Sequence, residues 1–252
     1  MLFGLIGFFS AVVAAGFRCK RYGLTRHEPA FIGVFGGLGL LAGGSLLFAI
    51  TRLPVAWQIR EVFFVNPLGY LQFLFGGIVF YGGLFGALFG VYAYSRFFKE
   101  SFSVAMKLAV PVFPLAHFFM RIGCFMGGCC VGIPHAWGIA FPAPISGAPA
   151  GVPLLPVQLY EAAANLVIFA VLMLFTKKER HWLAPLALYA IMYATVRFFL
   201  EFIRYDAIRG EVLGISTSQF ISLGIVFACL LAAAVPETRR LVFLEEARPG
   251  SA

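Results

Sequence analysis

Long apolar runs separated by short polar segments make up most of the chain. The runs are close to 20 residues long, and their apolar residues are continuous rather than alternating. A transmembrane helix needs about 20 apolar residues, whereas a membrane-spanning strand alternates apolar and polar positions. The pattern therefore predicts about seven transmembrane helices, over residues 2–17, 30–50, 69–94, 108–120, 157–175, 183–203 and 216–235.

The composition supports a membrane protein. The 252 residues are 61% hydrophobic and 12% charged, whereas soluble domains are about 45–50% apolar and about 25% charged. We expect an all-α polytopic bundle that forms a single domain over residues 1–252. The net charge of +8 would favour nucleic acid in a soluble protein. Here the basic residues lie in short connections between spans, so we expect no nucleic-acid partner.

Basic residues divide unevenly between alternate connections. If the first connection is cytoplasmic, that side carries Arg18, Lys20, Arg21, Arg26, Arg96, Lys99, Lys107, Lys177, Lys178, Arg180, Arg239 and Arg240. The other side carries Arg52, Arg60, Arg121, Arg204 and Arg209. Because cytoplasmic connections are enriched in Lys and Arg, we expect an outside N-terminus and a cytoplasmic C-terminus. Residues 1–17 lack a charged leading region, which indicates a span rather than a signal peptide. Their shortness leaves a longer natural N-terminus open.

Proline and glycine mark irregularities inside the predicted helices. Pro111 and Pro114 are expected to break the fourth helix, because proline cannot donate to the helical hydrogen-bond ladder. Gly82, Gly86 and Gly90 are four residues apart, so they leave one face of the third helix bare. Another helix is expected to pack closely on that face.

The segment from His117 to Gly132, HFFMRIGCFMGGCCVG, begins at the end of an apolar run and finishes in glycines and cysteines. Arg121 lies where hydrocarbon is expected to give way to water. Glycines follow it at positions 123, 127, 128 and 132, and a backbone without β-carbons can turn sharply and approach a ligand. A fixed cation beside such a loop predicts a site for an anionic lipid head group, which the topology places toward the outer leaflet.

Charged residues in the later spans are expected at the same level of the membrane. A charge at mid-membrane costs about 2.5–3.5 kcal/mol on insertion scales, so it usually faces a polar interior and has a partner. Arg197 and Glu201 are four residues apart and can pair on one helix face, which on its own would make a structural brace. With Arg121, Glu161 and Arg204 they are expected to line a shared polar cavity. Arginines that converge there would suit a phosphate.

Three cysteines in the segment from His117 to Gly132 allow more than one interpretation. Cys124, Cys129 and Cys130 lack the CxxC spacing that marks strong zinc sites, although His117 and His135 are nearby. They fit buried free thiols that pack as small apolar groups, an oxidised pair on the outward face, or a metal site. The spacing leaves these three alternatives open.

Several stretches, taken in order, match a known pattern. They are FGL at 3–5, GGIVFYGGLFG at 76–86, RIGCFMGGCCVG at 121–132, PVQLYE at 156–161, RFFLEFIR at 197–204 and TSQ at 217–219. In these stretches the chain resembles the prolipoprotein diacylglyceryl transferases, the bacterial enzymes that begin lipoprotein maturation. The resemblance runs nearly end to end. It implies a multi-pass protein of the bacterial inner membrane whose site faces the outer leaflet.

The resemblance implies transfer of the diacylglyceryl group of phosphatidylglycerol to the lipobox cysteine of a prolipoprotein, without a cofactor or metal. The expected partners are phosphatidylglycerol, prolipoprotein signal peptides and membrane lipids. The expected catalytic residues are Arg121, Arg197 and Glu201, with His117 either a base or a helix-end residue without a chemical role. The expected phosphatidylglycerol-binding residues are Arg121, Gly132, Tyr81, Gly82, Gly83, Gln158, Tyr160, Glu161 and Arg204.

The central motif departs from the family pattern at polar positions. The family's signature asparagine is Cys124 here, its glutamate falls at Cys129, and its usual histidine before Gly-Gly-Leu is Tyr81. The alternative function is therefore a diverged relative that binds anionic lipid, or does thiol or metal chemistry through Cys124, Cys129 and Cys130, without diacylglyceryl transfer. A transporter is disfavoured, because the sequence lacks an inverted repeat and paired broken helices.

Overall fold

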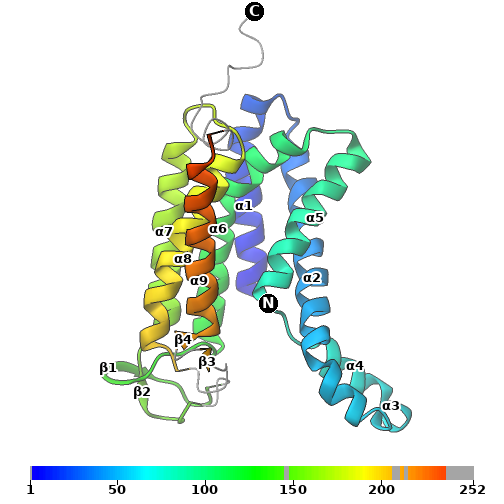
Figure 1. The fold of residues 1–252 in the computed structure, drawn as a ribbon, viewed down its shortest axis with the longest axis vertical. Coiled ribbons are helices and arrows are strands. Elements are labelled where there is room, and N and C mark those ends of the chain that lie inside the picture. The colour runs from blue at the N-terminus through cyan, green and yellow to red at the C-terminus, as the bar shows by residue number, and fades with distance from the viewer. Residues whose placement is uncertain (1, 145–147, 206–210, 213–214, 237–252) are drawn as a thin grey trace, which may run out of the picture. The chain divides into compact units, whose positions relative to one another are not determined.

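The computed structural model describes residues 2–144, 148–205, 211–212 and 215–236, and it is mostly helical (Figure 1). The predicted topology signals at Arg209, Arg239 and Arg240 lie outside the described residues. The helices are α1 (Leu2–Cys19), α2 (Glu28–Gln58), α3 (Val62–Val65), α4 (Pro67–Phe75), α5 (Phe80–Phe98), α6 (Phe102–Met126), α7 (Val157–Phe175), α8 (Leu183–Leu200) and α9 (Thr217–Ala234). Two short 3₁₀ helices are η1 (Lys20–Tyr22) and η2 (Glu201–Ile203), and the strands are β1 (Pro134–Ala140), β2 (Pro153–Leu154), β3 (Glu211–Val212) and β4 (Ile215–Ser216).

Five stretches are long and apolar enough to cross a membrane: Leu2–Tyr22, Glu28–Gln58, Phe102–Met126, Val157–Phe175 and Leu183–Ile203. A shorter apolar helix, Ser218–Ala234, coincides with the last predicted span. These helices confirm an all-α polytopic membrane protein. The count of seven spans and the orientation of the termini stay predictions.

The chain divides into two compact units, one of residues 1–15 and 107–252 and the other of residues 16–106. The prediction of a single domain over residues 1–252 stays a prediction. In the first unit, α6, α7, α8 and α9 run alternately in opposite directions (Figure 1). The C-terminal ends of α6 and α8 therefore meet the N-terminal ends of α7 and α9 at one end of this unit, which we call the loop end.

The predicted break in the fourth helix is wrong. α6 is continuous from Phe102 to Met126, with Pro111 and Pro114 inside it. Prolines are tolerated in membrane helices because neighbouring groups and local adjustments satisfy the freed backbone. One consequence concerns Arg121, which was expected at the start of a glycine loop. It lies in the helix instead, and the loop begins only at Gly127.

Backbone hydrogen bonds tie three connections together at the loop end. They run from Gly132 N–H to Leu155 O, from Ile133 N–H to Ile203 O and from Tyr205 N–H to Val131 O, at 2.8, 2.9 and 3.0 Å. β1 and β2 continue this junction as a small antiparallel sheet. The segment after α6 is thus fixed to the segment before α7 and to the end of α8.

The second unit is built on close packing between α2 and α5. Gly39 and Gly43 of α2 lie against Gly82 and Gly86 of α5, and a β-carbon on any of the four would run into the backbone of the opposite helix. Gly90 lies in the same way against the backbone at the start of α2. The bare glycine face predicted for the third span is therefore confirmed.

The predicted third helix, residues 69–94, is two helices in the structure. α4 ends at Phe75 and α5 begins at Phe80. Gly76 and Gly77 weaken helix at this point, because glycine is about 1 kcal/mol less favourable than alanine in a helix. Val79 is extended, with φ −93° and ψ 123°, and its N–H donates to Gly44 O of α2 at 3.1 Å. Pairing with α2 therefore replaces a helical hydrogen bond at the break.

Gly86→Ala tests the packing of α2 on α5. The new β-carbon meets the carbonyl of Gly39 and the Cα of Gly43. We expect the free energy of unfolding to fall by at least about 1–3 kcal/mol, the usual cost of overpacking. Gly37→Ala on α2 is the matched control, because a β-carbon there meets nothing within 4 Å. Thermal unfolding in one detergent measures both, and a Gly86→Ala variant as stable as the wild type would contradict the close contact.

Candidate active site

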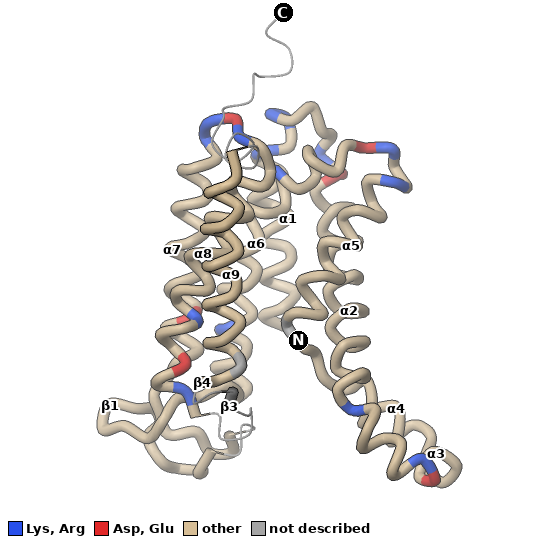
Figure 2. Tube along the Cα trace, viewed as in Figure 1, with Lys and Arg blue, Asp and Glu red and all other residues tan. Residues whose placement is uncertain are grey.

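Charged residues of the first unit form two groups along the helices (Figure 2). One group lies on the connection between α7 and α8, and the other lies on α6, α7 and α8 toward the loop end. Hydrogen bonds and ion pairs join the second group to the start of α9. The residues form two bonded clusters, which together we call the polar network: His117, Arg121, Glu161 and Tyr193 in one, and Arg197, Glu201 and Ser218 in the other.

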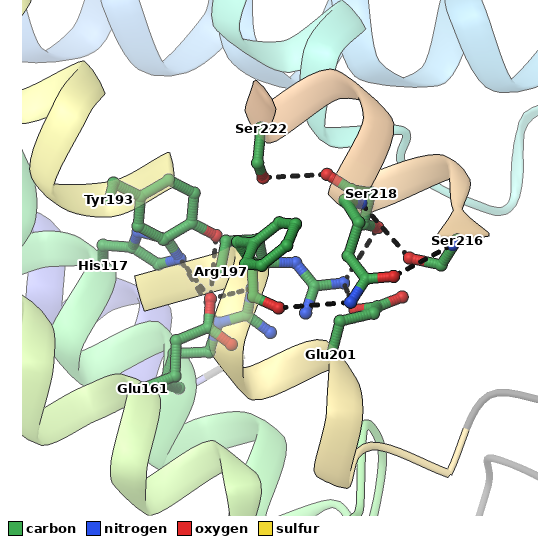
Figure 3. Close-up of polar contacts among 11 residues, drawn as sticks. His117, Glu161, Tyr193, Arg197, Glu201, Ser216, Ser218 and Ser222 are labelled. Atoms are coloured by element: carbon green, nitrogen blue, oxygen red, sulfur yellow. Dashed lines mark hydrogen bonds and ion pairs between the residues drawn. The ribbon is translucent and has the colours of Figure 1, made fainter. Parts of the chain in front are cut away.

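Glu161 is the centre of one half of the polar network (Figure 3). Its side chain is only 1% exposed, and Oε1 lies 2.8 Å from Arg121 Nη2. The same oxygen accepts a hydrogen bond from the Tyr193 hydroxyl at 2.8 Å. His117 Nε2 lies 3.9 Å from it and accepts a hydrogen bond from Arg121 Nε at 3.3 Å. Two partners therefore fix the Arg121 guanidinium on one side.

Arg197 forms the other half of the network. Its Nη2 lies 2.7 Å from Glu201 Oε2 and donates to Ser218 Oγ at 3.1 Å. Its Nη1 is buried and has no hydrogen-bond partner among the residues that the structure describes. A buried donor without a partner is unfavourable by about 1–3 kcal/mol, and by more for a charged group. Arg197 thus presents an unfilled, charged donor, which suits an anionic ligand.

A capping box at the start of α9 positions Ser218. Ser216 Oγ accepts from Gln219 N–H at 3.2 Å, and Gln219 Oε1 accepts from Ser216 N–H at 3.0 Å. This reciprocal pair satisfies two backbone donors at the helix start and fixes its first turn. Ser222 Oγ also donates to Ser218 O at 2.8 Å (Figure 3). The capped first turn of α9 therefore holds Ser218 beside Arg197.

Gly132 and Arg204 face each other in an antiparallel bridge at the loop end. A β-carbon on Gly132 would lie 2.7 Å from Ile203 O, Leu155 Cβ and Val157 Cγ2. Only glycine fits without displacing one of these groups. The close approach brings the segment after α6 against the end of α8, where the buried Arg204 begins the next connection.

The three cysteines of the central segment converge in space. Cys124 lies near the end of α6, and the backbone then turns through two positive φ angles, 64° at Gly128 and 60° at Cys130. The Sγ atoms of Cys124, Cys129 and Cys130 lie within 4.8 Å of one another, and none of the three is in a disulfide. Gln158 Nε2 donates to Cys129 O at 2.7 Å and holds this turn against α7.

The thiols after α6 differ in acidity. Hydrogen bonds from Cys124 and Cys129, together with the nearby cations of Arg204 and Arg121, lower the pKa of the Cys130 thiol. Hydrogen bonds with Cys124 and Cys130 raise the pKa of the Cys129 thiol. The cluster therefore favours one thiolate, and that thiolate lies within electrostatic range of two arginines.

The structure brings most of the predicted site residues of the first unit together. His117, Arg121 and Glu161 are joined in one half of the network and Arg197 and Glu201 in the other. Gly132 and Arg204 lie in the connections at the loop end, and Gln158 lies in the first turn of α7. Tyr160, by contrast, is 43% exposed on α7. Its predicted role in binding phosphatidylglycerol stays a prediction.

Tyr81, Gly82 and Gly83 belong to the second unit, at the start of α5. Within that unit Gly82 lies against Gly43 and Gly83 lies against Leu40, both on α2. The structure therefore gives the two glycines a role in helix packing. The predicted part of all three residues in lipid binding stays a prediction.

Sequence reasoning missed Tyr193 and Ser218. Tyr193 lies four residues before Arg197 on α8, so the spacing that paired Arg197 with Glu201 extends one turn back to it. Ser218 lies in the TSQ stretch, but a serine at a helix start more often caps the helix than binds a distant arginine. The spacing could have found Tyr193, whereas only the fold brings Ser218 to Arg197.

Comparison with known proteins gives a consistent result. The family model of the prolipoprotein diacylglyceryl transferases matches residues 1–235. The chain belongs to this family. It is 33% identical over 223 residues to the phosphatidylglycerol–prolipoprotein diacylglyceryl transferase of Clostridium tetani, covering 86% of this chain and 84% of the relative. It is 36% identical over 194 residues to such a transferase, number 2, of Clostridium perfringens, covering 76% and 72%.

A third member of the prolipoprotein diacylglyceryl transferase family, from Idiomarina loihiensis, is 34% identical over 209 residues, covering 80% of this chain and 74% of the relative. The range that the family model matches includes every residue of the polar network and all three clustered cysteines. The network and the thiols therefore lie within the part of the chain that matches the family.

Proposed function

We propose that the protein transfers the diacylglyceryl group of phosphatidylglycerol to the cysteine thiol of prolipoproteins. Membership of the family and the names of the relatives support this reaction. The observation that carries it in the structure is the buried Nη1 donor of Arg197, which has no hydrogen-bond partner among the described residues. A guanidinium fork matches the oxygens of a phosphate, and phosphatidylglycerol carries one negative phosphate in its head group.

In this reaction the thiolate sulfur attacks the glyceryl carbon that carries the phosphate. A carbon–sulfur bond forms, the carbon–oxygen bond breaks, and glycerol phosphate leaves with the bonding electrons. Negative charge grows on the departing phosphate, and cations fixed in a dry site stabilise such charge most strongly. We assign this work to Arg121 and Arg197, which reach the site from different helices and are each held on one side by a carboxylate.

The remaining proposed residues orient these arginines or shape the site. Glu161 and Glu201 hold Arg121 and Arg197 through ion pairs of 2.8 and 2.7 Å. We assign His117 to positioning, because its Nε2 already accepts a hydrogen bond from Arg121 and the side chain is 1% exposed. A proton acceptor for the incoming thiol needs a free lone pair that the thiol can reach.

Three further residues at the loop end are proposed to shape the lipid-binding site. Gly132 lets the segment after α6 come close to the site, and Arg204 adds positive charge there. Gln158 supports the cysteine turn. The proposal adds Tyr160, Tyr81, Gly82 and Gly83 as lipid contacts, on the resemblance alone.

The distribution of charge supports a proposed topology in the bacterial inner membrane. Taking α4 and α5 as one crossing, the chain crosses seven times, with the N-terminus outside and the C-terminus in the cytoplasm. The basic connection between α7 and α8 is then cytoplasmic, and the loop end of the first unit faces outward. This places the network beside the outer leaflet, where phosphatidylglycerol and prolipoproteins would both be reached.

A transfer assay tests the proposed function. The purified protein is mixed in detergent with phosphatidylglycerol and a lipobox peptide, and the peptide is weighed by mass spectrometry. We expect a gain equal to one diacylglyceryl group, and no gain when serine replaces the peptide cysteine. If the enzyme from Clostridium tetani modifies the peptide under these conditions and this protein does not, the proposal is wrong.

A further inference from the structure

The convergence of Cys124, Cys129 and Cys130 calls for a chemical explanation, because the turn that produces it is strained. Cys130 takes a positive φ of 60°, which is uncommon for a residue with a β-carbon. Cys129 N–H closes the turn by donating to Cys124 O at 3.1 Å. This turn brings Cys129 and Cys130 back toward Cys124 and places the three sulfurs within 4.8 Å of one another.

We propose that these three thiols bind a soft divalent metal ion, Zn²⁺ or one of the same class, and leave one coordination position open. Thiolates are the preferred ligands of such ions. Sulfurs bound about 2.3 Å from a tetrahedral zinc lie ~3.8 Å apart. The observed sulfurs all lie within 4.8 Å of one another, so small side-chain rotations bring them into range. Three protein ligands with a fourth open position are typical of zinc sites that act on a substrate.

The charges around the cluster fit this ion. Three thiolates and one divalent cation carry a net charge of −1, which must be balanced in a partly buried place. Arg204 and Arg121 both lie within electrostatic range of Cys130. Because Arg121 is already paired with Glu161, Arg204 is the cation that offsets this charge. The three cysteine residues are also only partly buried.

The arrangement of the sulfurs also separates a metal site from a disulfide. A disulfide joins two sulfurs and leaves the third without a function. Here each sulfur lies within reach of both others. A bound metal uses all three sulfurs, which is why we favour it over a disulfide.

The open position has a natural occupant if the transferase function holds, and this step rests on that proposal. The acceptor substrate is itself a thiol, and a thiol that coordinates a metal loses its proton outright. The proton passes to solvent, and the metal-bound sulfur is the nucleophile. The site lies beside Arg121, where the phosphate is proposed to bind. The metal would thereby supply the thiolate that His117 is poorly placed to generate.

Metal binding is tested on the full chain in detergent, after reduction and removal of metal with a chelator. Co²⁺ is added as the probe, followed by competition with Zn²⁺. We expect one Co²⁺ per chain, with a sulfur-to-cobalt charge-transfer band in the near ultraviolet that Zn²⁺ abolishes. Cys129→Ser should weaken binding at least tenfold, whereas Cys229→Ser, which changes a thiol on α9, should leave the band unchanged. A wild-type protein that binds no cobalt, or a Cys129→Ser variant that binds it equally well, overturns the proposal.

Site-resolved alkylation gives a second readout that does not need activity. With Zn²⁺ bound, iodoacetamide should label Cys124, Cys129 and Cys130 at least tenfold more slowly, while Cys229 in the same molecule reacts at an unchanged rate. Equal labelling with and without Zn²⁺ overturns the metal site. A lipobox peptide should shift the cobalt band only if it carries cysteine, and no shift overturns the open position. These measurements stand apart from the transfer assay, so failure of the transferase function alone leaves the cobalt band intact.

Discussion

Arg121→Ala is expected to lower the rate of diacylglyceryl transfer by about 10²–10³, the usual effect of removing one fixed donor from developing negative charge. The same change leaves the carboxylate of Glu161, 1% exposed, without its cation. Lost activity alone would therefore not separate catalysis from folding. The rate is measured by mass spectrometry of the lipobox peptide, at saturating phosphatidylglycerol.

A double variant separates the two effects of losing Arg121. Arg121→Ala with Glu161→Gln removes both charges, so it should recover much of the lost stability but none of the activity. Arg121→Lys keeps the charge without the two-pronged geometry and should fall between wild type and alanine. Arg96→Ala, at an exposed position on α5, is the matched control and should be fully active. Transfer at the wild-type rate in Arg121→Ala would refute the assigned role.

Glu161→Ala is expected to have the largest effect on stability. Removing one partner of a buried ion pair typically costs about 3–5 kcal/mol, because the remaining charge is left uncompensated. In this chain the loss also removes the acceptor of the Tyr193 hydroxyl. Unfolding by heat and by denaturant, in the same detergent, measures the change.

Two milder variants calibrate the Glu161 result. Tyr193→Phe removes one hydrogen bond and keeps the ion pair, so it should cost only about 1 kcal/mol. Glu61→Ala changes an exposed carboxylate and should cost almost nothing. If Glu161→Ala and Glu61→Ala unfolded at the same temperature, the buried pair would not be the support that we infer.

The long apolar runs made much of the membrane architecture predictable, because a bilayer accepts few other structures. Ends and breaks of helices were less predictable, since they depend on neighbours. Pro111 and Pro114 lie within a continuous α6, although both have the residue type that ends most helices. Val79 leaves the helical path because Gly44 of another helix offers its carbonyl.

The candidate site was also only partly predictable: its charged residues could be found from the sequence, but most of their contacts could not. Glu161 and Arg197 were found from sequence because a charge within an apolar span is rare and needs a partner. Arg121 was found as a cation at the predicted end of a span, beside a run of glycines. Their pairing was not predictable, since it depends on how three helices are rotated. The sequence suggested that Glu201 would pair with Arg197, and the structure has this ion pair at 2.7 Å. The spacing of Cys124, Cys129 and Cys130 left open whether the three thiols would meet, and the structure brings them together.

The ion pair between Arg121 and Glu161 also bears on how the protein is made. α6 leaves the ribosome before α7, and the two are separated by residues 127–156. Until α7 arrives, Arg121 lacks the Glu161 carboxylate that lies beside it in the folded unit. A nascent chain that stops between the two helices therefore lacks the partner that holds Arg121 in the finished unit. The pair of charges that serves the site is thus also a contact that can form only once both helices have been made.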